Sequence, residues 1–355
     1  MTRAREILAT NRPLLILIVP LAVVAIVGST VGGTLLGRIL TIFFINLILV
    51  LSLQLFTGNS GLLSFAHTGF MGIGAYVSAV LTMTPAAKAA AIPDLYPFLE
   101  PIQVPFIVGV LGGALVAALV AAVISFPLMR LSDVASVIST FALLVIVQVV
   151  LAHWSQVTNG PRTLFGLLQY TDLPTAALWG LVFLVVAWAF KHSSVGLRLR
   201  ASRDSEFAAS TLGIDIVRLR WVAFTISAFV AGFAGGLWAH FITSFTPRAF
   251  YLTETFVILT MLIVGGPRTV SGAVVGTVAV TVAFQGLRSI ENELNIQLAP
   301  FQIVGLTEIV LAVVLIIVLT LRPGGLLEES EIMSRARRAA RRASGPAAGT
   351  SEEAG

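Results

Sequence analysis

The chain has 355 residues, of which 57% are hydrophobic and 11% are charged, with a formal net charge of +5 and no cysteine. Globular chains carry about 25% charged residues, so this composition excludes a water-soluble surface around most of the chain. The lack of cysteine excludes disulfides and cysteine metal sites, and positive charge confined to a few segments suits membrane orientation rather than nucleic-acid binding.

Long apolar runs recur along the sequence. About 18 to 20 apolar residues suffice to cross a hydrocarbon core about 30 Å thick. Charged or turn-forming breaks separate eight runs, at 13–29, 35–56, 61–84, 105–127, 132–152, 173–190, 222–245 and 302–321. The basic start resembles a signal peptide, but no clear cleavage site follows it and a second long apolar run begins soon after. We therefore predict a retained first span after a cytoplasmic segment at 1–12.

Basic residues gather in two segments, from Lys191 to Arg220 and from Arg322 to Arg342. The positive-inside rule places both in the cytoplasm, so an even number of crossings separates them. Two short helices at about 254–265 and 271–287, joined by the turn at 265–268, give that even number. One tilted, kinked helix with a misassigned loop is the alternative.

The sequence thus predicts an all-α polytopic membrane protein with about ten transmembrane helices and both termini in the cytoplasm. The membrane domain extends over 13–327, with a cytoplasmic loop at 191–221. The polar composition of 328–355 predicts a disordered cytoplasmic tail. Helices of about 12 residues cannot span alone, so they are expected to be buried or to line a polar cavity, which makes Gly265 and Gly266 candidates for functional geometry.

Catalytic chemistry finds little support in the sequence. The chain has two lysines, Lys88 and Lys191, and neither lies in a GxxxxGKS/T phosphate loop. The four histidines are scattered without a second ligand at helical spacing. We predict no catalytic residue, no metal site and no cofactor.

The run GLLSFAHTGFMGIGAY at 61–76 is unusually rich in glycine for an apolar segment. Dense glycine permits close helix approach or a broken helix. His67 is then either a packing residue bonded to a neighbouring helix or a residue that lines a solute path. The candidate residues of this run are Ser64, His67, Gly69, Gly72 and Gly74.

The cytoplasmic loop contains a second signal, a short helix that ends at Gly213. Ser202 or Asp204 is its expected N-cap, and glycine is a common stop. A soluble partner can bind such a short helix on the surface. Alternatively, the segment is a solvated loop that only sets the topology. Glu308 is an acidic residue well inside the last span, and it is expected to face the bundle or water, where it either pairs with a polar residue or lies on the solute path.

Five segments resemble the LivM-type permease of branched-chain amino acid ABC importers, in the family's order. They are the glycine-histidine run at 61–76, VGLRLRASRDSEFAASTLGI at 195–214, AFTISAFVAGFAGGL at 223–237, TMLIVGGPRTVSGAVVG at 260–276, and the exit at 322–326. The resemblance covers about residues 35–327. Departures at Ala66, Ser202 and 158–160 leave the substrate open.

The resemblance implies a transport subunit, not an enzyme, in the cytoplasmic (inner) cell membrane. Its partners would be two cytoplasmic ABC ATPase subunits, a sibling permease and an extracytoplasmic substrate-binding protein. Helix 204–212 would couple to the ATPases through Arg203, Asp204, Glu206, Ala208, Ala209 and Gly213. The translocation path would be lined by Ser64, His67, Gly69, Gly72, Gly74, Gly265, Gly266 and Glu308.

Two other functions stay open at this point. An ion-coupled secondary transporter of small organic solutes needs paired intramembrane acids or a coupling-ion site, and Glu308 alone is thin support for it. A structural membrane protein would not need dense glycines together with a capped cytoplasmic helix.

Overall fold

The computed structural model describes residues 2–30, 33–131, 133–297, 305–321 and 324–327. The side chains of 2–13 and of several α14 residues lie outside this description, as does the whole of 328–355, where the sequence predicts a disordered tail. Within the described ranges the chain is helical apart from its connections, and Leu164 and Phe245 form an isolated antiparallel bridge. This confirms the predicted all-α class.

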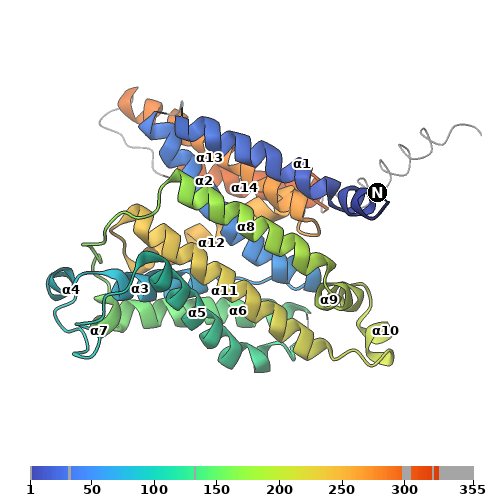
Figure 1. The fold of residues 1–355 in the computed structure, drawn as a ribbon, viewed down its shortest axis with the longest axis horizontal. Helices are drawn as coiled ribbons and strands as arrows, with labels where there is room; N and C mark the ends of the chain where they lie inside the picture. The colour runs from blue at the N-terminus through green and yellow to red at the C-terminus, as the bar shows by residue number, and fades with distance from the viewer. Residues whose placement is uncertain (1, 31–32, 132, 298–304, 322–323, 328–355) are drawn as a thin grey trace, which may run out of the picture.

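The described part of the chain has ten helices of 14 residues or more, which pack into a bundle (Figure 1). They are α1 (Thr2–Thr30), α2 (Thr34–Leu53), α3 (His67–Thr82), α5 (Phe106–Leu128), α6 (Asp133–His153), α8 (Leu173–His192), α11 (Ile216–Ile242), α12 (Leu252–Gly265), α13 (Val270–Gln297) and α14 (Leu306–Leu321). Short helices connect them: the π-helix η1 (Gln54–Gly58), α4 (Pro85–Ala91), α7 (Ser155–Thr158), α9 (Ser194–Asp204), α10 (Glu206–Thr211) and the 3₁₀-helix η2 (Pro247–Phe250).

Seven segments of the described chain are long and apolar enough to cross a membrane. They are α2 with η1, α5, α6, α8, α11, η2 with α12, and α13. Helix α1 adds the shorter apolar stretch Leu14–Thr30, and α3 and α14 have 16 residues each. The multi-pass membrane character is therefore confirmed, whereas ten crossings and cytoplasmic termini stay predictions.

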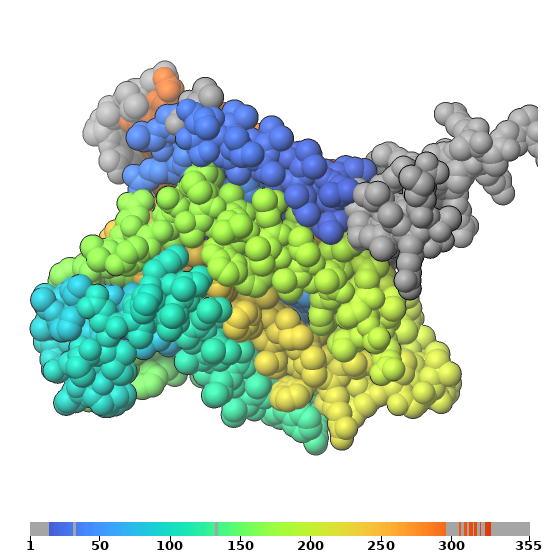
Figure 2. Space-filling view, in the orientation of Figure 1, coloured from blue at the N-terminus to red at the C-terminus, as the bar shows by residue number. Residues whose placement is uncertain are grey.

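The helices run between two ends of the bundle. Figure 1 places the start of α1, α9 and α10 toward the same end, and α4 and α7 toward the other. In Figure 2, α1 lies along α8, and α10 projects from the edge of the molecule. We call the end that carries α9 and α10 the loop end.

The stretch 255–284 divides into two helices, as the charge pattern predicts. Helix α12 ends at Gly265, and Gly266 has a φ of 112°, a backbone conformation open mainly to glycine. The second helix is not short: α13 has 28 residues, because no proline or other strong breaker occurs before its end. The predicted span at 61–84 is also wrong at its start, since 61–66 is non-helical and Gly61 has a φ of 78°.

Helix α3 packs tightly between α5 and α11. A Cβ added at Gly74 would overlap the carbonyl oxygen of Gly232, and one at Gly235 would overlap the carbonyl oxygen of Met71. A Cβ added at Gly113 would likewise overlap the carbonyl oxygen of Gly74. The dense glycines therefore bring three backbones into direct contact, as small residues do between membrane helices.

Candidate functional site

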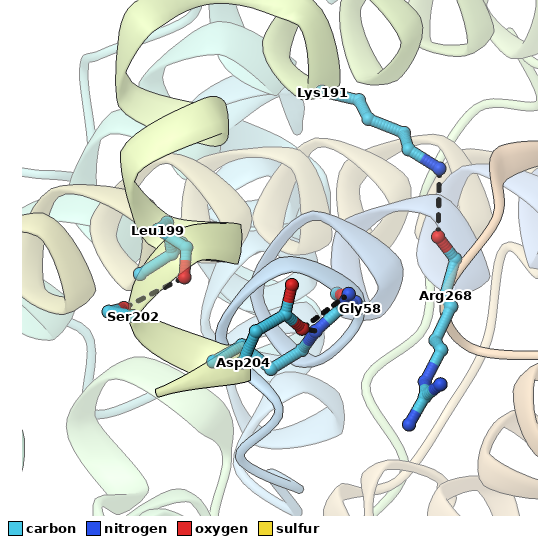
Figure 3. A network of polar contacts seen from close by, with 7 residues as sticks. Gly58, Lys191, Leu199, Ser202, Asp204 and Arg268 are labelled. Carbon is cyan, nitrogen blue, oxygen red and sulfur yellow. Dashed lines mark hydrogen bonds and ion pairs between the residues drawn. The ribbon is translucent and has the colours of Figure 1, made fainter. Parts of the chain in front are cut away.

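The predicted short helix of the cytoplasmic loop is present as α10. Its N-cap is Ser205, whose hydroxyl accepts a hydrogen bond from the Ala208 N–H at 3.2 Å. The prediction of Ser202 or Asp204 as N-cap is wrong, because both residues lie in the last turn of α9 and have helical backbones. Figure 3 shows the buried Ser202 donating instead to the Leu199 carbonyl, at 2.7 Å.

Helix α10 presents apolar side chains to the outside. Gly213 ends it with a φ of 73°, as the sequence predicts. Of the two alanines, Ala208 is exposed and Ala209 is buried. Phe207 is 80% exposed and Leu212 is 78% exposed. Two large apolar side chains therefore lie exposed on this short loop segment, outside the predicted spans.

Two of the predicted coupling residues also hold the loop to the bundle. The Arg203 guanidinium donates to the Gly58 carbonyl at 2.8 Å and also pairs with Asp204 at 3.2 Å. Glu206 accepts a hydrogen bond from Arg220, which is only 4% exposed at the start of α11. These contacts fix the position of α10 relative to α2 and α11.

The turn between α12 and α13 lies at the same end. Figure 3 shows the Lys191 ammonium donating to the Arg268 carbonyl at 2.9 Å, which ties the end of α8 to this turn. The backbone N–H groups of Leu326 and Leu327 donate to the carbonyls of Val264 and Gly265 at 2.8 and 3.1 Å. Gly265 and Gly266 are thus packed within a junction of α12, α13 and 324–327.

A cavity of about 390 Å³ opens where these parts meet. We call it the arginine pocket. Its polar lining comes from η1, the end of α9, the start of α10, the first part of α11 and the turn before α13. It includes Thr57, Arg203, Glu206, Arg220 and Arg268. Segments that are more than 200 residues apart in the sequence therefore share one charged site.

His67 lies in the contact between α3 and α11. Its Nε2 is 2.9 Å from the Ser227 hydroxyl, its Nδ1 is 3.1 Å from the Ser64 hydroxyl, and its ring packs against Phe224. Both ring nitrogens have partners and the side chain is buried. This is the geometry of the packing alternative, in which a polar side chain joins two membrane helices.

The remaining path candidates are not gathered around one space. Gly69 packs against Val147 of α6, and a Cβ at Gly72 would lie 2.9 Å from Leu151. Gly265 meets Gly272 of α13, away from the α3 contacts. Glu308 falls in α14, but its side chain lies outside the described part of the structure.

Residues 35–319 match the family model described as branched-chain amino acid transport system / permease component. The chain belongs to this family. The match includes α2, the arginine pocket and α10, so the site lies within the family's shared region rather than in an added segment.

Relatives of this permease carry related descriptions. It is 28% identical over 271 residues to the high-affinity branched-chain amino acid transport system permease protein LivM of Escherichia coli, covering 64% of this chain and 58% of that protein. The Salmonella typhimurium LivM is 27% identical over 296 residues, covering 70% and 63%. The chain thus spans less than two thirds of either relative.

Substrates differ among more distant relatives. The nucleoside ABC transporter permease protein NupC of Lactococcus lactis is 26% identical over 117 residues, covering 32% of this chain and 37% of that protein. No solved structure matches this permease.

Sequence reasoning missed three features of this permease that the structure reveals. His240 is buried and lies 2.7 Å from the Thr82 hydroxyl, a second histidine link between α3 and α11. The pair of Arg220 and Glu206 was not anticipated, because residues 14 apart in a loop give no periodic signal. Phe207 and Leu212 could have been found as large apolar residues within a charged, non-spanning segment.

Proposed function

We propose that this chain is the transmembrane permease subunit of an ATP-driven (ABC) importer of branched-chain or related amino acids, in the cytoplasmic cell membrane. Family membership favours this function over an ion-coupled secondary transporter. The names of the LivM relatives support an amino-acid substrate, and the nucleoside relative keeps the solute class a proposal.

The observation that carries the proposal is the construction of α10. Its apolar residues Phe207 and Leu212 face outward, while the inward contact from Glu206 to Arg220 fixes the helix to the bundle. A loop that served only as a topology signal would need neither feature. A rigid helix with an exposed apolar surface is suited to bind a soluble ATPase and to transmit its conformational change to α9, α11 and α2.

The partners follow from this role. We place two ATPase subunits at the loop end, a sibling permease beside the bundle, and an extracytoplasmic binding protein at the opposite end. Ten crossings and two cytoplasmic termini are consistent with the start of α1 and α10 lying at one end in Figure 1. In this arrangement α10, which begins at Glu206, makes the main contact with the ATPase through its exposed residues.

We place the solute path between this chain and its sibling, along α3 and α12. The ring of Phe65, just before α3, contacts that of Phe256 in α12, and Phe256 is partly exposed. His67 and Ser64 would position this wall rather than touch the solute, because their polar atoms bond to each other and to Ser227. Glu308 keeps its proposed place on the path.

Co-purification with the ATPase subunits tests the proposal. Wild type and Phe207→Leu are expected to retain ATPase on affinity purification, whereas Phe207→Asp together with Leu212→Asp is expected to lose it. Both sites are exposed, so folding should change by less than about 0.5 kcal/mol per substitution. Uptake in proteoliposomes should require internal ATP. Uptake driven by an ion gradient, with no bound ATPase in wild type, would overturn the proposal.

A further inference from the structure

The arginine pocket has an excess of positive charge. Three guanidinium groups line it, from Arg203, Arg220 and Arg268, against the single carboxylate of Glu206. Asp204 pairs with Arg203 but does not line the cavity. The cavity therefore has a net charge that attracts anions, even after both acidic residues are counted.

Two buried donors in the pocket lining have no partner among the described residues. They are the Nε of Arg220 and the hydroxyl of Thr57, which is 7% exposed. Leaving a buried donor unpaired costs about 1–3 kcal/mol, so a ligand that supplies acceptor atoms is favoured here.

Arg268 adds a third available donor group. Its carbonyl holds Lys191, but its guanidinium extends away from that lysine in Figure 3 and makes no ion pair within the described part of the chain. The side chain is exposed at the mouth of the pocket. A ligand between Arg268 and Arg220 would contact guanidinium groups from two separate elements.

We propose that the arginine pocket binds a phosphate-type oxyanion. Arginine guanidiniums match phosphate oxygens in geometry as well as charge, and the threonine hydroxyl completes a set of donors. The cavity has room for more than a bare carboxylate. Inorganic phosphate and the phosphate of an anionic lipid headgroup share this chemistry.

The bound anion would join three parts of the loop end. Thr57 lies in η1 after α2, Arg220 lies in the second turn of α11, and Arg268 lies in the turn between α12 and α13. Because α10 is fixed to Arg220 through Glu206, an anion at this point would stiffen the base of α10. The pocket is thus a site through which anion concentration or lipid composition sets the mobility of this junction.

Thermal unfolding of the full chain in detergent tests the site without any transport partner. Inorganic phosphate should raise the midpoint of wild type in a saturable manner, beyond chloride at equal ionic strength. Arg268→Gln should weaken the apparent affinity about tenfold, as loss of one charge-assisted contact does. The matched control is Arg198→Gln, because Arg198 is an exposed arginine of α9 that does not line the pocket.

A second arm distinguishes the two sources of phosphate. In nanodiscs, phosphatidylglycerol should raise the midpoint more than phosphatidylcholine, with the gain lost in Arg268→Gln, if a lipid headgroup is the ligand; a response to inorganic phosphate alone identifies the free anion. Equal responses of wild type, Arg198→Gln and Arg268→Gln to both sources would overturn the proposal, as would no response beyond chloride. None of these results depends on the proposed ATPase contact.

Discussion

The contact of α3 with α11 and the arginine pocket are built in opposite ways. Between α3 and α11, glycines bring backbones together and the polar side chains of His67, Ser227 and His240 all have partners. At the pocket, a cavity remains and buried polar atoms of Arg220 and Thr57 lack partners in the described structure.

The difference indicates which part of the permease can change shape. A close-packed contact whose histidine and serine side chains are hydrogen-bonded has few alternative arrangements, because any shift loses both packing and polar contacts. A junction with a cavity and unsatisfied donors loses less when it moves. Helix η1 is a π-helix and lies at the arginine pocket. π-Helices are rare overall, but those that occur are frequently found at functional sites.

The largest expected effect is at the closest backbone contact. A Cβ at Gly235 would overlap the Met71 carbonyl oxygen, so Gly235→Ala should lower the free energy of unfolding by about 3 kcal/mol, as overpacking does. Gly286→Ala is the matched control in α13, where nothing lies within 4 Å, and it should gain up to about 1 kcal/mol from helix propensity. Reversible unfolding of both variants measures this; equal stability would show that α3 and α11 can separate freely.

A smaller effect, an increase in the free energy of unfolding, is expected for a substitution beside the arginine pocket. Both amide atoms of Gln54, in η1, are buried without a partner in the described structure. Gln54→Met removes this unsatisfied amide and should raise the free energy of unfolding by about 1–2 kcal/mol. The exposed Gln103→Met is the control and should stay within about 0.5 kcal/mol.

The functional readout sharpens this second prediction. If Gln54→Met is more stable but transports more slowly, the unsatisfied amide serves the transport cycle at a cost in stability. Destabilisation by Gln54→Met would instead show that the amide is satisfied in the membrane, and the contrast between the two regions would fail.

Much of the fold was predictable because membrane spans are dictated by local hydropathy. The break between α12 and α13 followed from counting basic segments and from glycine and proline at 265–267. The start of α3 was not predictable, since apolar residues at 62–66 hide a non-helical stretch that depends on the left-handed Gly61.

The candidate site was predictable as parts but not as a whole. The sequence marks the coupling segment and the Gly-Gly-Pro-Arg turn separately, whereas their meeting in one pocket depends on helix packing. Arg203 is an example: its charge and loop position favour an outward side chain, yet the Gly58 carbonyl at the end of η1 binds it. Because Arg203 and Gly58 are 145 positions apart in the sequence, no local sequence pattern predicts their contact.

The smallest expected effect concerns the histidine link itself. A double-mutant cycle with His67→Leu and Ser227→Ala should give a coupling energy of about 0.6 kcal/mol and at most about 1.7 kcal/mol, the range of interhelical hydrogen bonds in membranes. A control cycle of His67→Leu with Thr82→Val should give a coupling near zero, because 15 residues of helix separate the sites by about 22 Å. If the first cycle also gives zero, glycine packing alone holds α3 to α11, and His67 is free to serve the solute path after all.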